Sequence, residues 1–314
     1  MAIPVAAVEH APIDWEVPEQ QIGLWSDAWV RFRRNRLAVI GLSAVVLLIV
    51  IALAMSAWPL WVSLGILKDP FYQDLVNIQV GPGSAGHLLG TDELGRDTLS
   101  RLLLGSQVSL TVGLLVQGII FPIGLAIGLA AGYFGGRIDN ILMRFTDIWY
   151  AFPDLLFVLV VVSVWRLTGA WYVQLIPIFG AIALVNWVGL ARLVRGQVLS
   201  IKEKEYIEAA RSAGSPPLKL ILKHLLPNSL GPIIVALTFG VPQAIFLEAV
   251  LSFLGVGIQP PQPTWGQMVN DGYEAIYANP TAVVFPALAI GFTLLAFTFI
   301  GDGLRDALDP RMRR

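Results

Sequence analysis

Residues 203–227 read EKEYIEAARSAGSPPLKLILKHLLP, a charged stretch that lies between two long apolar segments. The chain of 314 residues is 56% hydrophobic and only 14% charged, and its mean hydropathy is +0.70. Soluble domains carry charge on about a quarter of their residues, and one soluble core cannot bury this much apolar surface. We therefore expect an integral membrane protein that presents residues 203–227 outside the lipid.

Several classes of site are excluded by composition. The formal net charge of −1 provides no basic field for nucleic acid. The chain has no cysteine, which excludes disulfides, thiol catalysis and cysteine-based metal sites. The three histidines, His10, His87 and His224, lie far apart and lack the spacing of metal ligands. We expect no catalytic residue, no metal site and no bound cofactor on this chain.

Six segments are apolar over the roughly 20 residues that a membrane helix needs. They are 37–57, 106–131, 146–166, 172–192, 229–254 and 283–302. The third is the least regular, because Asp147 and Asp154 lie near its start. The fold class expected from this pattern is an all-α polytopic membrane protein with six transmembrane helices.

The distribution of basic residues predicts the orientation. With the N-terminus inside, 17 of the 21 Lys and Arg residues fall on the cytoplasmic side, the side on which such residues concentrate. Both termini and residues 193–228 are therefore expected to be cytoplasmic. The chain then divides into a cytoplasmic segment 1–36, a first span 37–57, an external loop 58–105, a five-helix core 106–302 and a cytoplasmic tail 303–314.

The charged cytoplasmic stretch has the pattern of two short helices. Residues 201–213 lack Pro and Gly, and Gly214 can end a helix in the left-handed conformation. Ser215 is the expected N-cap of a second helix, 216–225, which should stop before Pro227.

One face of the first helix carries Tyr206 and the alanines Ala209, Ala210 and Ala213 at spacings of three and four. Helices this short need a surface to pack on. That surface is either a partner protein or the lipid, although the face lacks Trp and Phe.

The segment Glu208-Ala209-Ala210, followed by Gly214 and by Leu226-Pro227, resembles the EAA loop of ABC importer permeases, which would span residues 201–227 here. The resemblance implies that the hairpin docks into a groove on a cytoplasmic ATPase, with Glu208 and the small residues beside it as the contact surface. It implies the type I importer permease fold. His224 departs from the general pattern, where isoleucine is frequent, but is similar to the peptide subgroup.

Two external motifs resemble the peptide/nickel branch of these permeases. One is His87–Asp97, with the sequence HLLGTDELGRD, and the other joins Leu251–Gly257 (LSFLGVG) to Gln259–Pro261 and Pro263–Gly266. Together with the basic and apolar start, Trp29–Ala57, the resemblance covers nearly the whole chain. The long external loop is similar to that of the C-type member of paired dipeptide and oligopeptide permeases.

The resemblance implies a function and a set of partners. The chain would import di- or oligopeptides across the bacterial cytoplasmic membrane, with a second permease and an external substrate-binding protein. Two cytoplasmic ATPase subunits would hold ATP and Mg. Nickel or another small solute is the alternative cargo, and an ion-coupled secondary transporter is the alternative mechanism.

Four charged residues of the external loop, Asp92, Glu93, Arg96 and Asp97, invite two interpretations. Paired carboxylates are typical of hydrolases, but no second titratable cluster accompanies them. Carboxylates can instead cap the helix expected to start near Thr98. Contact with a substrate-delivering partner is a further expectation for these residues.

Glu248 lies inside the fifth span, where burying an ionisable side chain is energetically unfavourable unless it faces a cavity or a polar partner. It either lines the substrate path or an outer gate, or it is hydrogen-bonded for helix packing. The second span carries small residues that permit close helix packing: Gly113, Gly118, Gly124, Gly128 and Gly132.

Overall fold

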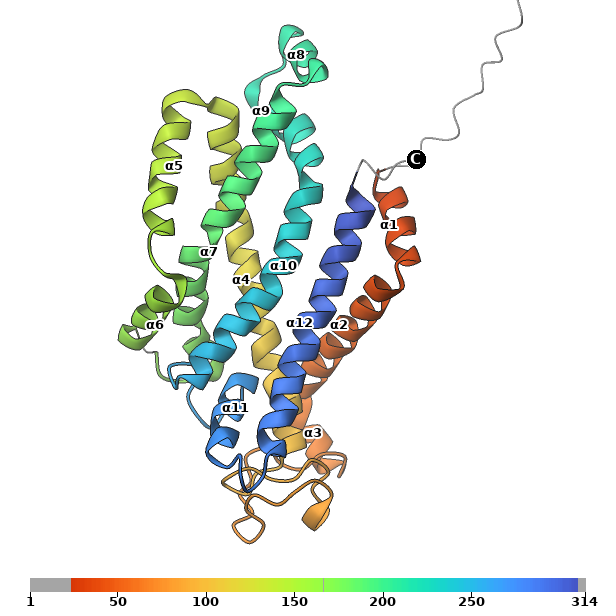
Figure 1. Ribbon diagram of the computed structural model, residues 1–314, viewed down its shortest axis with the longest axis vertical. Coiled ribbons are helices and arrows are strands. Elements are labelled where there is room, and N and C mark those ends of the chain that lie inside the picture. Colours follow the sequence, from red (N-terminus) through yellow and green to blue (C-terminus); the bar gives the residue numbers. More distant parts are fainter. Residues whose placement is uncertain (1–23, 166, 310–314) are drawn as a thin grey trace, which may run out of the picture.

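The computed structural model of the protein describes residues 24–165 and 167–309, and its regular elements there are helices (Figure 1). Residues 1–23 of the expected N-terminal segment, position 166 and residues 310–314 of the expected tail lie outside the described residues.

Within the described ranges, five helices are long and apolar enough to cross a membrane. The first is α2 (Arg36–Ala54), extended by the turn η1 (Met55–Ala57) and by α3 (Trp58–Ser63). The others are α4 (Thr98–Phe134), α7 (Trp171–Lys202), α10 (Leu226–Phe253) with the turns before it, and α12 (Thr281–Leu308). A sixth passage is made by two helices, α5 (Gly136–Tyr150) and α6 (Asp154–Val164), if the pair counts as one.

The expectation of one continuous helix over 146–166 is wrong. α5 begins ten residues earlier, and α5 and α6 meet at an angle of 76°. Pro153 explains the break, because proline lacks the backbone N–H and disfavours helical backbone in the residue before it. Pro153 is the extended N-cap of α6, with φ −63° and ψ 118°.

Other helices run past the expected spans. α4 begins at Thr98, so the external loop ends at residue 97 and not at 105. α7 continues to Lys202, and α12 continues to Leu308 through the first part of the expected tail. Polar helix ends explain the difference, because hydropathy marks only the apolar middle of each helix.

The centre of the bundle is the contact of α4 with α7, and glycines of α4 make it close. Gly124, Gly128 and Gly132 face large aliphatic residues of α7: Leu190, Val194 and Val198. A Cβ atom added at Gly128 would lie 2.5 Å from the Cβ of Val194. The prediction of close helix packing is confirmed for these three residues. Gly118, in contrast, has no neighbouring atom within 4 Å of that position.

The two ends of the bundle differ in what they carry. The start of α1 (Leu24–Arg34) and the end of α12 lie at the same end as α8 (Glu205–Ser212) (Figure 1). The loop between α3 and α4, which includes the short turn η2 (Ser84–Gly86), lies at the opposite end near α11 (Trp265–Glu274) (Figure 1). This arrangement agrees with an even number of crossings, because residues 24 and 309, the two ends of the described part, lie on one side.

Candidate functional sites at the two ends of the bundle

A helical hairpin joins α7 to α10 and extends beyond the bundle (Figure 1). Its first limb, α8, ends in a turn at Gly214, where φ is +78°. Only glycine adopts this left-handed conformation without strain. The Gly214 N–H donates to the Arg211 carbonyl oxygen at 2.9 Å, and the Ser215 N–H donates to that of Ala210 at 3.1 Å. The expected helix end at Gly214 in the left-handed conformation is therefore confirmed, and its part in ATPase coupling stays a prediction.

The second limb departs from the expectation in two ways. α9 (Pro217–Leu220) begins at Pro217 with Pro216 as its N-cap, so Ser215 is not the cap. The helix does not stop before Pro227 but passes through a π-helical turn, η3 (Ile221–Leu225), into α10. Pro227 follows directly on the π-helical turn, where the regular i→i−4 hydrogen-bond pattern is already interrupted, so a residue without an N–H is accommodated there.

The hairpin is held together from within the chain. Ile207 of α8 is fully buried, as are Leu220 and Leu225 of the second limb. The rings of Tyr206 and His224 lie 6.4 Å apart, one on each limb. The Asn228 side-chain amide donates to the His224 carbonyl oxygen at 2.6 Å. These contacts stabilise the short helices without a partner, so the hairpin is a preformed shape.

The outer surface of the hairpin is open. Glu208 and Ala209 are exposed, and Ala210 is half-buried. Two leucines of the second limb, Leu218 and Leu222, are 66% and 54% exposed. Sequence reasoning missed these two, because leucine is equally typical of a buried helix face. Both leucines line one shallow surface hollow together with Pro216, and exposed apolar residues that gather in this way are typical of an interaction surface.

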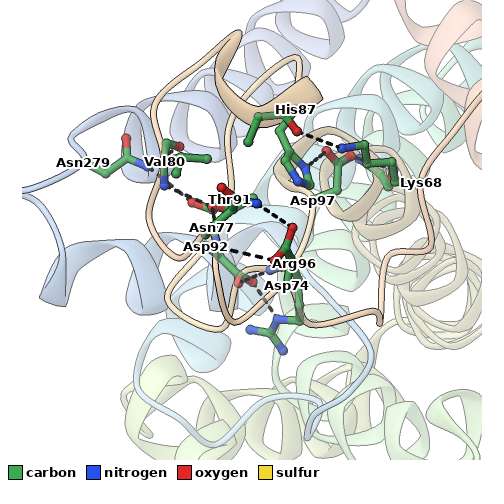
Figure 2. A network of polar contacts seen from close by, with 12 residues as sticks. Lys68, Asp74, Asn77, Val80, His87, Thr91, Asp92, Arg96, Asp97 and Asn279 are labelled. Carbon is green, nitrogen blue, oxygen red and sulfur yellow. Dashed lines mark hydrogen bonds and ion pairs between the residues drawn. The ribbon is translucent and has the colours of Figure 1, made fainter.

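The external loop is organised by two aspartates (Figure 2). Asp92 accepts hydrogen bonds from the backbone N–H groups of Leu94 and Arg96 at 3.0 and 2.9 Å. It also accepts from the Nε–H of Arg96 at 2.6 Å. Gly95 stands between them with φ +74° and presses against the Asp74 backbone, so this turn requires glycine.

Asp97 is the N-cap of α4 and accepts from the backbone N–H and the hydroxyl of Ser100 at 2.9 and 2.7 Å. Its other carboxylate oxygen lies 2.8 Å from His87 Nδ1. The expectation that a carboxylate caps this helix is confirmed. Arg96 and Asp97 are both buried by contacts within the chain, so a partner would touch neither side chain directly. Glu93 is half-buried and Leu94 is exposed, which leaves these two, with the partly exposed Asp92, for an external contact.

Glu248 is enclosed, with no exposed surface. The hydroxyl of Ser252 donates to Oε1 at 2.7 Å, and the hydroxyl of Ser109 on α4 lies 3.3 Å from Oε2. These bonds join α10 to α4 and favour the packing interpretation. A role for Glu248 in the pathway or gate stays a prediction.

Within residues 24–165 and 167–309, His, Asp and Glu side chains do not gather in threes as metal ligands would. The features on which function can rest are therefore a helical membrane bundle, a preformed hairpin at one end and an ordered loop at the other.

These features are those of a polytopic membrane protein, and comparison with known proteins identifies its family as one of transport permeases. Residues 124–314 match the family described as "Binding-protein-dependent transport system inner membrane component", and residues 23–76 match the "N-terminal TM domain of oligopeptide transport permease C". The first match spans more than half of the chain, which therefore belongs to the family of binding-protein-dependent inner-membrane transport components. The chain is a multi-pass inner-membrane protein, as the resemblance implied.

Curated relatives are similar over nearly their full length. The dipeptide transport permease protein DppC of Bacillus subtilis is 42% identical over 301 residues, which cover 95% of this chain and 89% of the relative. The oligopeptide transport permease protein OppC of Haemophilus influenzae is 42% identical, covering 92% and 89%. The glutathione transport permease protein GsiD of Pectobacterium atrosepticum is 40% identical, covering 92% of each.

Solved structures share the fold. A chain of the inward-facing MetNI methionine ABC transporter superposes with a TM-score of 0.51 at 21% identity, covering 67% of this chain and 97% of the other. A chain of an amino acid ABC transporter gives 0.50 at 16% identity, covering 66% and 94%. The prediction of an ABC importer permease fold is confirmed.

Proposed function

We propose that this chain is one of two permease subunits of an ATP-driven importer for di- or oligopeptides. The cargo follows from the relatives, two of which carry the names of dipeptide and oligopeptide systems. The relative named for glutathione transport also points to a peptide-like cargo. Nickel or another small solute remains the alternative cargo for the same machinery.

The observation that carries the proposal is the preformed, exposed hairpin at the cytoplasmic end of the bundle. Two cytoplasmic ATPase subunits, which bind ATP and Mg, would each receive a permease hairpin. Here the contact surface would be Glu208, Ala209 and Ala210 of α8, with Tyr206 beside them. We add Leu218 and Leu222, because their exposure leaves an apolar area that a partner would cover.

Continuity of the helices explains how the hairpin would act. Leu226 and Pro227 stand at the start of α10, and η3 joins the second limb to it without an interruption. The first limb follows α7 after two residues. A displacement of the hairpin would therefore move α7 and α10 together. Nucleotide can drive this motion only by binding more tightly to one of the two conformations.

The test is charge reversal on the hairpin in the complete importer, reconstituted in vesicles with its binding protein. Glu208→Lys should abolish both uptake and the stimulation of ATPase activity by loaded binding protein. Glu203→Lys is the matched control, because Glu203 is also exposed but lies before α8. Wild-type uptake and stimulation in Glu208→Lys would refute the docking surface.

A further inference from the structure

A cavity of about 260 Å³ lies between the middle parts of α4, α7 and α10, beside the break between α5 and α6. Three carboxamide side chains line it, one from each long helix: Gln117, Asn186 and Gln243. Each stands near the middle of its helix, far from both polar ends. Amides at this depth are unexpected in a bundle that only has to pack, because burying an unbonded amide in an apolar medium is unfavourable.

Two of these amides have no internal partner. Asn186 donates to the Ile182 carbonyl oxygen one turn earlier at 2.9 Å. In the described part of the chain, the side chains of Gln117 and Gln243 make no hydrogen bond at all. Their donors and acceptors are free for water or for a passing solute.

The opening of the cavity is polar as well. Gln243, Gly189 and Asp154 are exposed on the surface of the chain. A face with an exposed glutamine in the middle of α10 and a carboxylate nearby is poorly suited to lipid. It is suited to a water-filled passage, which the second permease would complete on the other side.

Small residues keep the cavity open. A Cβ atom at Gly240 would lie 2.5 Å from the side-chain oxygen of Gln117, so glycine there gives this side chain its place against α10. Gly189 lines the cavity and has no atom within 4 Å of its Cβ position. A large side chain at Gly189 would therefore enter free space.

The charged and polar groups that line the cavity indicate which kind of ligand it can bind. Among the residues that the structure describes, no Lys or Arg lines it, and Asp154 is its one charged residue. Carboxamide side chains both donate and accept hydrogen bonds, so they can pair with the backbone peptide groups of a ligand whatever its side chains are. A carboxylate is the natural partner of an ammonium group.

From these contacts we propose that the cavity is a transit site for the amino end of a peptide. The ammonium group lies at Asp154, and the first peptide groups bond to Gln117 and Gln243. This inference rests on the proposed peptide import. The volume is near the lower end of ligand pockets, roughly 300–1,000 Å³, so the site holds the leading end and not a whole oligopeptide.

The test uses the complete importer in vesicles, with uptake of labelled trialanine delivered by the binding protein. Gly189→Leu should lose uptake while keeping its elution as an intact complex. Gly180→Leu is the matched control, because Gly180 lies on α7, has equal free space and does not line the cavity. It should transport as the wild type does.

Variants at two further positions test the proposal if the Gly189→Leu complex fails to assemble. Gln243→Leu removes an exposed amide without a partner, and it should raise the KM for uptake. Asp154→Asn should raise the KM about tenfold, the effect of one hydrogen bond to a charged group, and Asp154→Glu should restore it. Normal uptake in Gln243→Leu and Asp154→Asn would overturn the transit site alone. Absence of trialanine uptake in the wild type would overturn the peptide function itself.

Discussion

At the scale of the residue, Gly214 sets the angle between the two limbs of the hairpin. Its φ of +78° would strain any other residue by about 1–2 kcal/mol. We expect Gly214→Ala to loosen the hairpin and to lower ATPase stimulation in the reconstituted importer, while the bundle remains folded. Gly196→Ala on α7, which has free space for the methyl group, should behave as the wild type. Equal stimulation in both variants would contradict the role of this turn.

Asp271 makes the external end sensitive to pH. Burial raises the pKa of its carboxyl above the usual range, although Arg101 and Arg96 act in the opposite direction. A raised native pKa means that the folded protein binds the proton more tightly than the unfolded chain. Its contribution to stability is therefore present in acid and lost as pH rises through the native pKa.

The Asp271→Asn variant isolates this effect, because it removes the titration and keeps the shape. Its melting temperature, relative to that of the wild type, should be higher at about pH 7 than at about pH 5. Thermal unfolding in detergent at both values gives the measurement. A difference that stays constant or reverses its sign would show that Asp271 does not carry this dependence.

At the scale of the element, α4 and α7 can pack closely because α4 carries glycines, which have no side chain, at the contact. Gly128→Leu would place atoms where Val194 and the Ala191 carbonyl oxygen already lie. Overpacking of this kind destabilises by about 1–3 kcal/mol, so we expect a lower melting temperature and less assembled complex. Gly118→Leu on the same helix enters free space and should change neither. A similar loss of stability and assembly in both variants would show that α4 does not tolerate leucine at any position, and would contradict the specific role of Gly128.

The sequence patterns predicted the existence of the long helices correctly, but they predicted the residues at which these helices begin and end less well. The hydropathy runs located all of the long helices, because a membrane helix needs a long apolar middle. They did not locate the polar ends of α4, α7 and α12. The break at Pro153 and the continuous path through Pro227 show that proline alone does not decide a helix end. At Pro153 the α5–α6 pair bends, whereas at Pro227 the π-helical turn η3 leads into a helical first turn.

Site residues were predictable where a turn or a cap required a particular residue type. Gly214 and Asp97 are of this kind, because their roles depend only on neighbouring backbone. Burial of Arg96 and Glu248, and exposure of Leu218 and Leu222, depend on distant segments and could not be predicted locally. The amides of the central cavity come from three helices, so only the fold brings them together.

At the scale of the whole molecule, we propose that the hairpin of α8 and α9 transmits the action of a cytoplasmic ATPase to α7 and α10. Because the chain has no cysteine, this role can be tested by cysteine cross-linking. A single introduced cysteine is then the only thiol of the chain, so any cross-link or thiol label can be assigned to its position. Ala209 is exposed on the hairpin, and Val76, 90% exposed, lies in the loop at the opposite end.

Cross-linking of the Ala209→Cys variant in the assembled importer tests the claim most directly. We predict that a bifunctional linker that reacts with the introduced thiol at one end and with amines at the other forms an adduct with the ATPase subunit, with a yield that changes when ATP binds. The Val76→Cys variant should form no such adduct and should react with a membrane-impermeant maleimide from outside. A transporting complex in which Ala209→Cys reacts from outside, or forms no ATPase adduct in any nucleotide state, would contradict the account.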